Sequence, residues 1–225
     1  DYRLIVLAPS SVQEMADFVA LGFDLAFKYR TPSMIIADGI IGQMMEKVIL
    51  PPYRPRRTND EIRQQCPWAT LGKPDNRERN VTTSLALEAE EMERTNLRLQ
   101  AKYKEICENE VRFEAVNCDD ADFVLIAFGS IARVCMSAME IGRKEGLKIG
   151  VLRPITLYPF PTLKIQELAK KAKGILTVEL SAGQMVEDVR LAVNGSIPVE
   201  FYGRMGGVVP TPEEVLEQLK KQLVK

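Results

Sequence analysis

Apolar runs of strand length alternate with segments of helical character along much of the chain. Residues 2–8 form the first apolar run. Ser11 and Glu14 follow it with the spacing of a capping box, which predicts a helix that continues to about Tyr29. Residues 33–38 form the next apolar run. This order predicts a β-α-β unit whose two strands are parallel and covered on both faces.

The first predicted helix is apolar nearly all round, so we expect most of it to be buried. Its large apolar residues are Val12, Met15, Phe18, Val19, Phe23, Leu25 and Phe27. Two strands do not make a covered parallel sheet by themselves, and the chain starts with Asp1 rather than Met. We therefore expect the chain to be a fragment of a longer one, with the front of this unit preceding Asp1.

The pattern changes in the middle of the chain. Residues 50–61 are rich in proline and arginine without periodicity, and residues 66–82 are typical of irregular surface chain. Residues 84–110 are strongly helical in character and charged on most sides. Their apolar residues fall on one narrow stripe, formed by Leu85, Met92, Leu99, Tyr103 and Ile106. We expect a linker with an outlying helix or helical hairpin over residues 51–118.

A regular alternation of strands and helices begins at residue 119. Glycines at the expected helix ends support three of the helices, and these are Gly146, Gly174 and Gly195. The last helix has Thr211 as its N-cap, Pro212 at the first helical position and Glu214 to complete a capping box. Four such strand–helix steps predict a compact α/β domain with a mostly parallel sheet.

The amino-acid composition disfavours several classes of partner and of catalytic site. The 225 residues are 46% hydrophobic and 27% charged, with a net charge of −1, so nothing favours a nucleic acid partner. No apolar stretch approaches the roughly 20 residues of a membrane span. The four cysteines include no C-x-x-C pair, which disfavours zinc and iron–sulfur ligation and fits a reduced, cytoplasmic setting. The chain has no histidine, which excludes histidine-based acid–base, nucleophilic and metal chemistry.

One heptad occurs twice, as GQMMEKV at residues 42–48 and as GQMVEDV at residues 183–189. Asp38 and Glu179 precede the two copies by the same four residues, each at the end of an apolar run. Because the flanking sequences differ, we interpret the copies as the same strand–loop pattern in two α/β units. The second copy should open a helix, with Gly183 allowing the turn. The first, soon followed by two prolines, can be at most a short helix or loop.

Several loops at expected strand ends could bind a ligand, and each has a simpler structural interpretation. Residues 128–133, FGSIAR, could bind an anion, although a tight turn is favoured because no phosphate-binding glycine motif is present. Residues 152–161 contain three prolines, and we favour a rigid loop that packs against another subunit. The Gly-Gly turn in residues 204–210 is best explained by backbone geometry. Asp38 and Glu179 are either site carboxylates or hold loops through backbone amides.

The linker carries an arginine cluster, formed by Arg54, Arg56, Arg57 and Arg63. It could contact an acidic partner or a phosphate, with a solvated linker face as the default interpretation.

Long unbroken strings resemble the alpha subunits of 2-oxoacid:ferredoxin oxidoreductases. Residues 2–48 resemble the last third of the pyrimidine-side thiamine diphosphate domain. Residues 67–85 and 97–114 are similar to the connecting segment of the 2-ketoisovalerate, or branched-chain, enzymes. Residues 121–161 and 178–219 resemble that subunit's carboxyl-terminal domain, which is of the transketolase C-terminal type.

The resemblance implies an α/β protein in three parts. Residues 1–50 would be the truncated end of the pyrimidine-side domain, residues 51–118 a linker with a long helix, and residues 119–225 the transketolase-like domain. In this family a 2-oxoacid is decarboxylated on thiamine diphosphate, its acyl group passes to coenzyme A, and two electrons reach ferredoxin through iron–sulfur clusters. Other subunits would hold the clusters, and a partner chain would bind the diphosphate and Mg²⁺.

The resemblance also limits the site. The family's catalytic glutamate belongs to the part that would precede Asp1, so no residue here is assigned a catalytic role, and none a metal. Neither Glu14 nor Glu46 is assigned the role of that catalytic glutamate. The loop after the 33–38 run is the candidate cofactor-binding segment, and its residues are Asp38, Gly39, Gly42 and Gln43. The fragment alone is expected to be inactive and not to bind thiamine diphosphate.

Two other functions stay open from the sequence. The beta subunit of an NAD-linked 2-oxoacid dehydrogenase shares the transketolase-type domain, although the long helical connector favours the ferredoxin branch. A non-catalytic α/β interaction module is the third hypothesis. The sequence does not indicate which 2-oxoacid would be the substrate.

Overall fold

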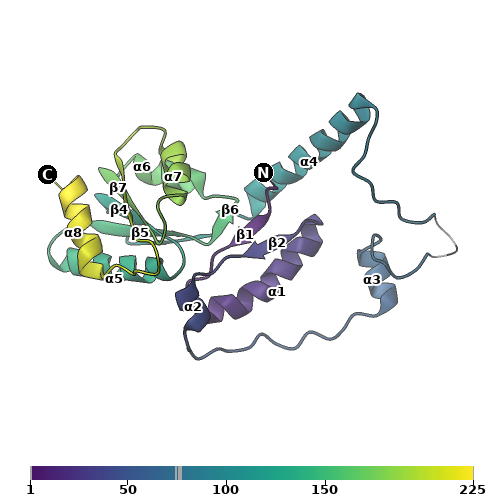
Figure 1. Cartoon of the computed structure of the whole chain (residues 1–225), viewed down its shortest axis with the longest axis horizontal. Helices are drawn as coiled ribbons and strands as arrows, with labels where there is room; N and C mark the ends of the chain where they lie inside the picture. Colours follow the sequence, from purple (N-terminus) through teal and green to yellow (C-terminus); the bar gives the residue numbers. More distant parts are fainter. Residues whose placement is uncertain (1, 74, 76–77, 225) are drawn as a thin grey trace.

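The computed structural model describes residues 2–73, 75 and 78–224. Within these ranges the chain forms two sheets, a small one near the amino terminus and a larger one built from the second half (Figure 1). Residues 74, 76 and 77, within the predicted irregular stretch 66–82, lie outside the described residues.

The first sheet has the order β2-β1-β6. Its strands β1 (Ile5–Leu7) and β2 (Ser33–Ile35) are parallel and are joined by helix α1 (Val12–Tyr29), so the predicted β-α-β unit is confirmed. Strand β6 (Thr156–Tyr158) pairs with β1 in the antiparallel direction. This strand comes from the proline-rich loop 152–161, so the loop packs against the first sheet of its own chain. Its contact with another subunit stays a prediction.

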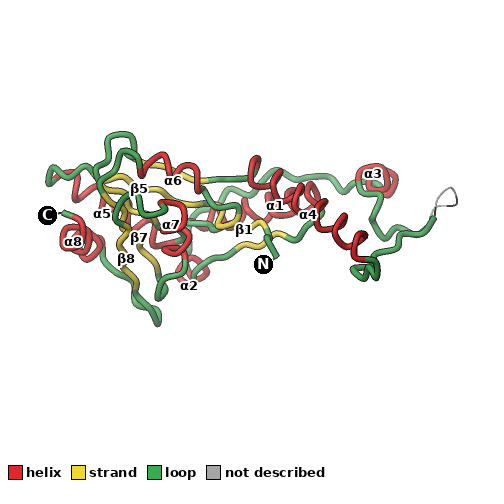
Figure 2. The backbone as a smooth tube through the Cα atoms, turned by 90° about the horizontal axis from the view of Figure 1, so that it is seen from above, coloured by secondary structure: helices red, strands yellow, loops and turns green. Residues whose placement is uncertain are grey.

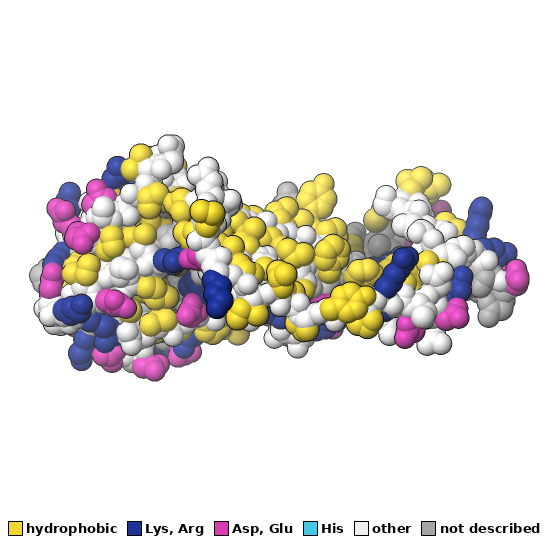
Figure 3. Space-filling view, turned by 90° about the horizontal axis from the view of Figure 1, so that it is seen from below, with side chains coloured by type: hydrophobic (Ala, Val, Ile, Leu, Met, Phe, Trp, Pro, Cys, Tyr) yellow, Lys and Arg dark blue, Asp and Glu magenta, His cyan; other side chains and the backbone are white. Residues whose placement is uncertain are grey.

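Helix α1 is buried on one face only, so the prediction that most of it is buried was wrong. Phe18 and Leu25 pack into the core of the first sheet. On the other side, Phe23 is 65% exposed and Phe27 is 50% exposed. Three short strands cover just one side of an 18-residue helix, which explains the difference. Figure 3 shows hydrophobic side chains gathered on the face of the molecule that carries this part of the chain.

The connector leaves the body of the molecule and returns to it. A short helix α2 (Gly39–Gln43) precedes it. The connector itself contains α3 (Asn59–Gln65) and then the long α4 (Ala89–Asn109), which projects from the first sheet (Figures 1 and 2). The carboxyl end of α4 is anchored, because Ile106 is fully buried in the core of the first sheet. The helix begins four residues later than the predicted apolar stripe, so Leu85 lies outside it and is exposed.

The second sheet has the order β3-β5-β4-β7-β8, and every pair except β3 with β5 is parallel. The strands are β3 (Phe113–Val116), β4 (Phe123–Ile126), β5 (Ile149–Pro154), β7 (Gly174–Glu179) and β8 (Val199–Gly203). The mostly parallel sheet was predicted. Strand β3 was not, because it lies in the segment interpreted as linker.

Helices cover both faces of the second sheet. Helices α5 (Ser130–Lys144) and α8 (Pro212–Leu223) pack together on one face, and α6 (Thr162–Ala169) with α7 (Met185–Val193) on the other. The predicted capping box of α8 is present in full. Gly174 does not end α6 but begins β7, where a Cβ would lie 2.7 Å from the Leu223 side chain. Among the described residues, none of the helices is both long and apolar enough to cross a membrane.

A charged cluster around one buried arginine joins the two sheets. Arg153 on β5 is 5% exposed, and its guanidinium binds both carboxylate oxygens of Glu14 at 2.8 and 2.9 Å and Glu114 at 2.9 Å. Glu14 starts α1, so this arginine fixes the amino end of that helix on the second sheet. Buried arginine–carboxylate pairs of this kind specify geometry more than they add stability.

Candidate functional site

The first predicted site residue, Asp38, follows β2 and is the N-cap of α2. One of its carboxylate oxygens, Oδ1, accepts hydrogen bonds from the amides of Ile40 and Ile41, both at 3.1 Å. The other, Oδ2, accepts from the amide of Ser130 at 2.8 Å. Of the two interpretations of Asp38, the structure supports the one in which its side chain holds loops through backbone amides.

The FGSIAR turn receives this carboxylate. Its glycine, Gly129, is the N-cap of α5 and has a φ of +70°, and it offers no side chain for capping. A Cβ at position 129 would lie 2.8 Å from Asp38 Oδ2. The turn is therefore the tight βα turn that the sequence favoured, and Asp38 occupies the amide end of α5 where an anion could otherwise bind.

Helix α5 also holds the first heptad in place, through Arg133. Arg133 Nη1 lies 2.7 Å from Glu46 Oε1 and 3.2 Å from Met44 Sδ. Glu46 Oε2 also accepts from the amide of Val12 at 3.1 Å. The hydrogen bond from Arg133 and then that from the Val12 amide hold the pKa of Glu46 below its ordinary value. Arg133 is therefore an ion-pair partner within the chain.

Glu179 has the corresponding position in the second sheet. It is 3% exposed, and its carboxylate accepts from the amides of Gln184, Met185 and Val186 at 2.9 to 3.1 Å. The Ser181 hydroxyl donates to it at 3.0 Å. As predicted, the second heptad opens a helix. The first heptad begins in the last two residues of the five-residue helix α2 and continues as extended chain. The two heptads thus share one device, an acid at a strand end that caps the next helix.

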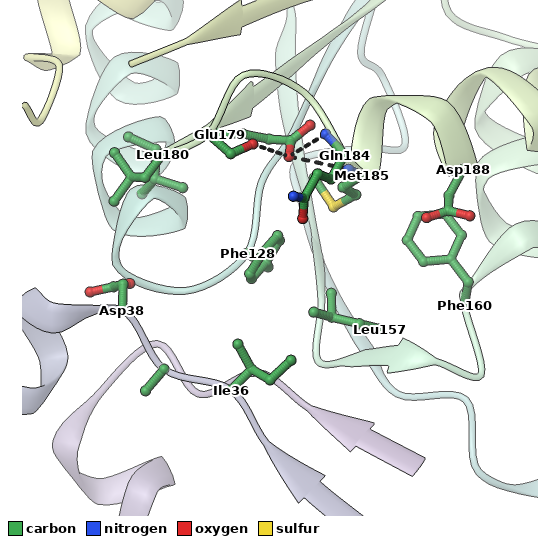
Figure 4. Close-up of a pocket in the computed structure, with 13 residues that line it drawn as sticks. Ile36, Asp38, Phe128, Leu157, Phe160, Glu179, Leu180, Gln184, Met185 and Asp188 are labelled. Carbon is green, nitrogen blue, oxygen red and sulfur yellow. Dashed lines mark hydrogen bonds between the residues drawn. The ribbon is translucent and has the colours of Figure 1, made fainter. Parts of the chain in front are cut away.

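A cavity of about 300 Å³ lies between the carboxyl ends of β2 and β7 (Figure 4). Its walls are mostly apolar, and they include Ile36, Phe128, Ile131, Leu157, Phe160, Leu180 and Met185. In the second sheet, β5 and β7 lie on opposite sides of β4, so the crevice beside β4 and β7 is a topological switch point, where open α/β sheets bind ligands. This cavity was not predicted, because the order of the strands in the sheet cannot be read from the sequence.

Carboxylates are the main polar groups of this cavity. Asp38 and Glu179 line it, but their oxygens are already engaged by backbone amides. Asp188 also lines it, and burial, followed by the charges of Glu187 and Glu179, raises the pKa of its carboxyl. The described lining residues include no lysine or arginine. The cavity is therefore unsuited to a phosphate or a 2-oxoacid carboxylate.

A second cavity of about 370 Å³ adjoins the predicted loop. Asp38, Gly39 and Gln43 line it from one side, and Arg204 with residues 207–209 lines it from the other. Gly42 lines neither cavity, so the structure brings three of the four predicted residues together. The Gly-Gly turn, which the sequence analysis explained by backbone geometry alone, has positive φ at Gly206 and Gly207 and also borders this cavity.

The described residues do not fit a metal diphosphate. They contain no group of three or more potential metal-ligating side chains, and Arg204 is the single cation lining the second cavity. That arginine is already paired with Glu214 at 3.5 Å. The four cysteines are unpaired, and Cys66, Cys118 and Cys135 are buried. The described part of the chain therefore offers neither a diphosphate site nor a cluster site, and we derive no reaction step on it.

Two family models match the chain. One is described as pyruvate flavodoxin/ferredoxin oxidoreductase, thiamine diphosphate-binding, and matches residues 1–111. The other, pyruvate:ferredoxin oxidoreductase core domain II, matches residues 121–215.

Curated relatives agree with these models. Ketoisovalerate oxidoreductase subunit VorB of Methanothermobacter thermautotrophicus is 45% identical over 98% of this chain and 61% of its own length. The 2-oxoglutarate synthase subunit KorA of Methanothermobacter marburgensis is 30% identical over 97% of this chain and 64% of its own. The chain thus spans about three fifths of the length of the curated relatives it matches.

Among solved structures, 2-oxoglutarate:ferredoxin oxidoreductase from Magnetococcus marinus aligns with a TM-score of 0.77 over 96% of this chain and 42% of that one, at 22% identity. A split-gene transketolase aligns with a TM-score of 0.53 at 15% identity, over 97% of this chain and 57% of that one. At these identities the two structures support the fold alone.

The fold is an α/β fold shared with transketolase and with 2-oxoglutarate:ferredoxin oxidoreductase, and the first half of the chain matches a thiamine diphosphate-binding family model. The chain belongs to the 2-oxoacid:ferredoxin oxidoreductase family, in the group that holds the ketoisovalerate and 2-oxoglutarate enzymes.

Proposed function

We propose that the chain is part of the alpha subunit of a branched-chain 2-oxoacid:ferredoxin oxidoreductase. The observation that carries this proposal is the 45% identity to a ketoisovalerate oxidoreductase subunit over 98% of the chain, against 30% to a 2-oxoglutarate synthase subunit. We further propose that the complex works in the cytoplasm, where the four unpaired cysteines fit a reducing setting.

The proposed reaction converts a 2-oxoacid, coenzyme A and two oxidised ferredoxins to acyl-coenzyme A, carbon dioxide, two reduced ferredoxins and one proton. Thiamine diphosphate would supply the carbon nucleophile that makes loss of the carboxylate possible. Because the described residues fit neither the diphosphate with Mg²⁺ nor iron–sulfur clusters, we propose that other subunits hold these groups.

We propose that this chain's own contribution is the loop that carries Asp38, Gly39, Gly42 and Gln43, although Gly42 does not line the second cavity. Gly39 and Gln43 line the second cavity with a neutral surface, which suits the edge of a planar ring better than an anion. Asp38 would act indirectly by holding the loop, since its oxygens bind amides. The proposed parts remain residues 1–50, 51–118 and 119–225, with the site loop at the end of the first.

Two alternatives make different predictions about partners. The beta subunit of an NAD-linked dehydrogenase would copurify with a lipoyl-bearing protein, whereas the proposed complex should contain iron and acid-labile sulfide. A non-catalytic module would give a complex without 2-oxoacid-dependent electron transfer. Purifying the native complex and assaying iron, sulfide and lipoyl groups would separate the first two. Lipoyl protein without iron would contradict our proposal.

A further inference from the structure

The segment from Asp38 to Glu46 is fixed at both ends by the first turn of α5. At one end, Asp38 Oδ2 accepts the Ser130 amide at 2.8 Å. At the other, Arg133 binds Glu46 at 2.7 Å and Met44 Sδ at 3.2 Å. Ser130 and Arg133 are one helical turn apart, so they lie on the same side of α5.

The two partners in this arrangement differ in rigidity. Helix α2, between the anchors, has five residues, too few to be stable without tertiary contacts. Helix α5 has 15 residues, and Ile131, Ala132 and Cys135 are all buried in the core against the second sheet and α8. The stable helix therefore determines the position of the short one.

The ion pair at Arg133 holds this position without contributing much to global stability. The Arg133 side chain is 49% exposed and that of Glu46 is 28% exposed. Ion pairs at this exposure contribute little to global stability. Their loss would loosen the 38–46 segment locally rather than unfold the protein.

We propose that Arg133 is a positioning residue, which acts through Glu46 and Met44 to hold the loop with Gly39 and Gln43 against the second cavity. The inference rests on the proposed function in one respect, that this loop faces the cofactor. It gives the carboxyl-terminal sheet a direct part in shaping a site that belongs to the first sheet.

The test compares Arg133→Gln, Arg133→Lys and Arg143→Gln in the assembled oxidoreductase. Arg143 is a matched control at the far end of α5, where it binds Asp120 at 2.6 Å and the carbonyl of Ile149 at 2.7 Å. Hydrogen exchange of amides 39–46, thermal unfolding and steady-state kinetics are measured for each variant.

For Arg133→Gln we expect exchange of amides 39–46 to rise about three- to five-fold, as loss of a partly exposed ion pair implies. We expect kcat to fall about three- to ten-fold with a smaller change in KM. Arg133→Lys should restore part of the slow amide exchange and part of kcat. Arg143→Gln should lower the unfolding temperature at least as much as Arg133→Gln while leaving exchange of amides 39–46 and kcat unchanged.

Unchanged exchange in Arg133→Gln would overturn the proposal, as would an equal rise in Arg143→Gln. Faster exchange with unchanged kcat would also overturn it, because the position of the loop would then have no effect on catalysis. If the wild-type complex oxidises no 2-oxoacid, the proposed function fails instead, and the exchange data still decide whether Arg133 holds the loop.

Discussion

The carboxylate of Asp38 and the backbone amide of Ser130 lie 2.8 Å apart, although 92 positions separate them in the chain. This contact joins the carboxyl end of a strand in the first sheet to the start of a helix on the second. The helix has no side-chain cap of its own at Gly129, so a residue from the other sheet supplies it. The candidate site is thus shaped by both halves of the chain.

Of Gly39, Gly42 and Gly129, the last should tolerate a side chain least. In Gly129→Ala, the φ of +70° adds strain and the new Cβ would lie 2.8 Å from Asp38 Oδ2. We expect a loss of about 2–5 kcal/mol, in which the close contact contributes about 1–3 kcal/mol. Urea unfolding of the full-length subunit measures it.

Gly146→Ala is the matched control, because its φ is +90° and a Cβ there meets nothing within 4 Å. It should cost only the strain of the left-handed backbone, about 1–2 kcal/mol. If the two variants lost equal stability, the Asp38 carboxylate would not lie where the structure places it.

Glu110 should make the protein sensitive to acid. Burial alone would raise the pKa of its carboxyl, but hydrogen bonds from Lys28, Tyr29 and Arg112 outweigh burial and lower it to about 2. Because the folded pKa is below the ordinary value of 4.5, the stabilisation is complete above pH 4.5 and is lost as the pH falls toward 2.

The measurement is the free energy of unfolding at pH 6 and pH 3 for the wild type and Glu110→Gln. The linkage predicts that the wild type loses about 2 kcal/mol more than the variant over this interval. Equal losses in the two proteins would show that Glu110 titrates normally in the folded state.

Glu179 should be far more important to stability than an exposed capping glutamate. In Glu179→Gln, the charge that three backbone amides and the Ser181 hydroxyl bind is removed in a buried position. We expect a loss of about 2–4 kcal/mol.

Glu214→Gln changes an exposed capping box of the same chemistry on α8 and should cost under about 1 kcal/mol. Thermal unfolding of both variants provides the comparison. A loss for Glu179→Gln no larger than that for Glu214→Gln would mean that its amide contacts are not formed in solution.

The two heptads should differ in their effect on catalysis. Gln43 lines the second cavity beside the proposed cofactor-facing loop, whereas Gln184 lines the first cavity, which has no cationic lining among the described residues. We expect Gln43→Ala to lower kcat/KM of the assembled enzyme about ten-fold or more, and Gln184→Ala less than about three-fold. A larger loss from Gln184→Ala would place the site at the other cavity.

Much of the fold could be predicted because its signals are local. The capping box at Thr211 and the apolar strands of the second sheet are visible in neighbouring residues. Strand β3 was missed because its four residues follow α4 with no turn signal and none is fully buried. Strand β6 was missed because its pairing with β1 depends on a partner more than 140 positions away, which no local pattern encodes.

The site was predictable only in part for the same reason. Asp38 could be selected because it ends an apolar run before a glycine, and both interpretations of it followed from that position. Its bond to Ser130 and the pairing of Arg133 with Glu46 depend on how the two sheets meet. The position of Phe128 in the first cavity depends on strand order, which places β4 beside β7.

The most direct test of the central claim is 2-oxoacid-dependent reduction of ferredoxin by the purified complex that contains this chain. With thiamine diphosphate and coenzyme A present, we predict that 2-ketoisovalerate is oxidised with a kcat/KM at least about ten-fold higher than that for 2-oxoglutarate, a difference of about 1.4 kcal/mol in transition-state binding. Omission of coenzyme A should abolish acyl-coenzyme A formation. Preference for 2-oxoglutarate would contradict the proposed branched-chain specificity, and reduction of NAD in place of ferredoxin would contradict the proposed function as a whole.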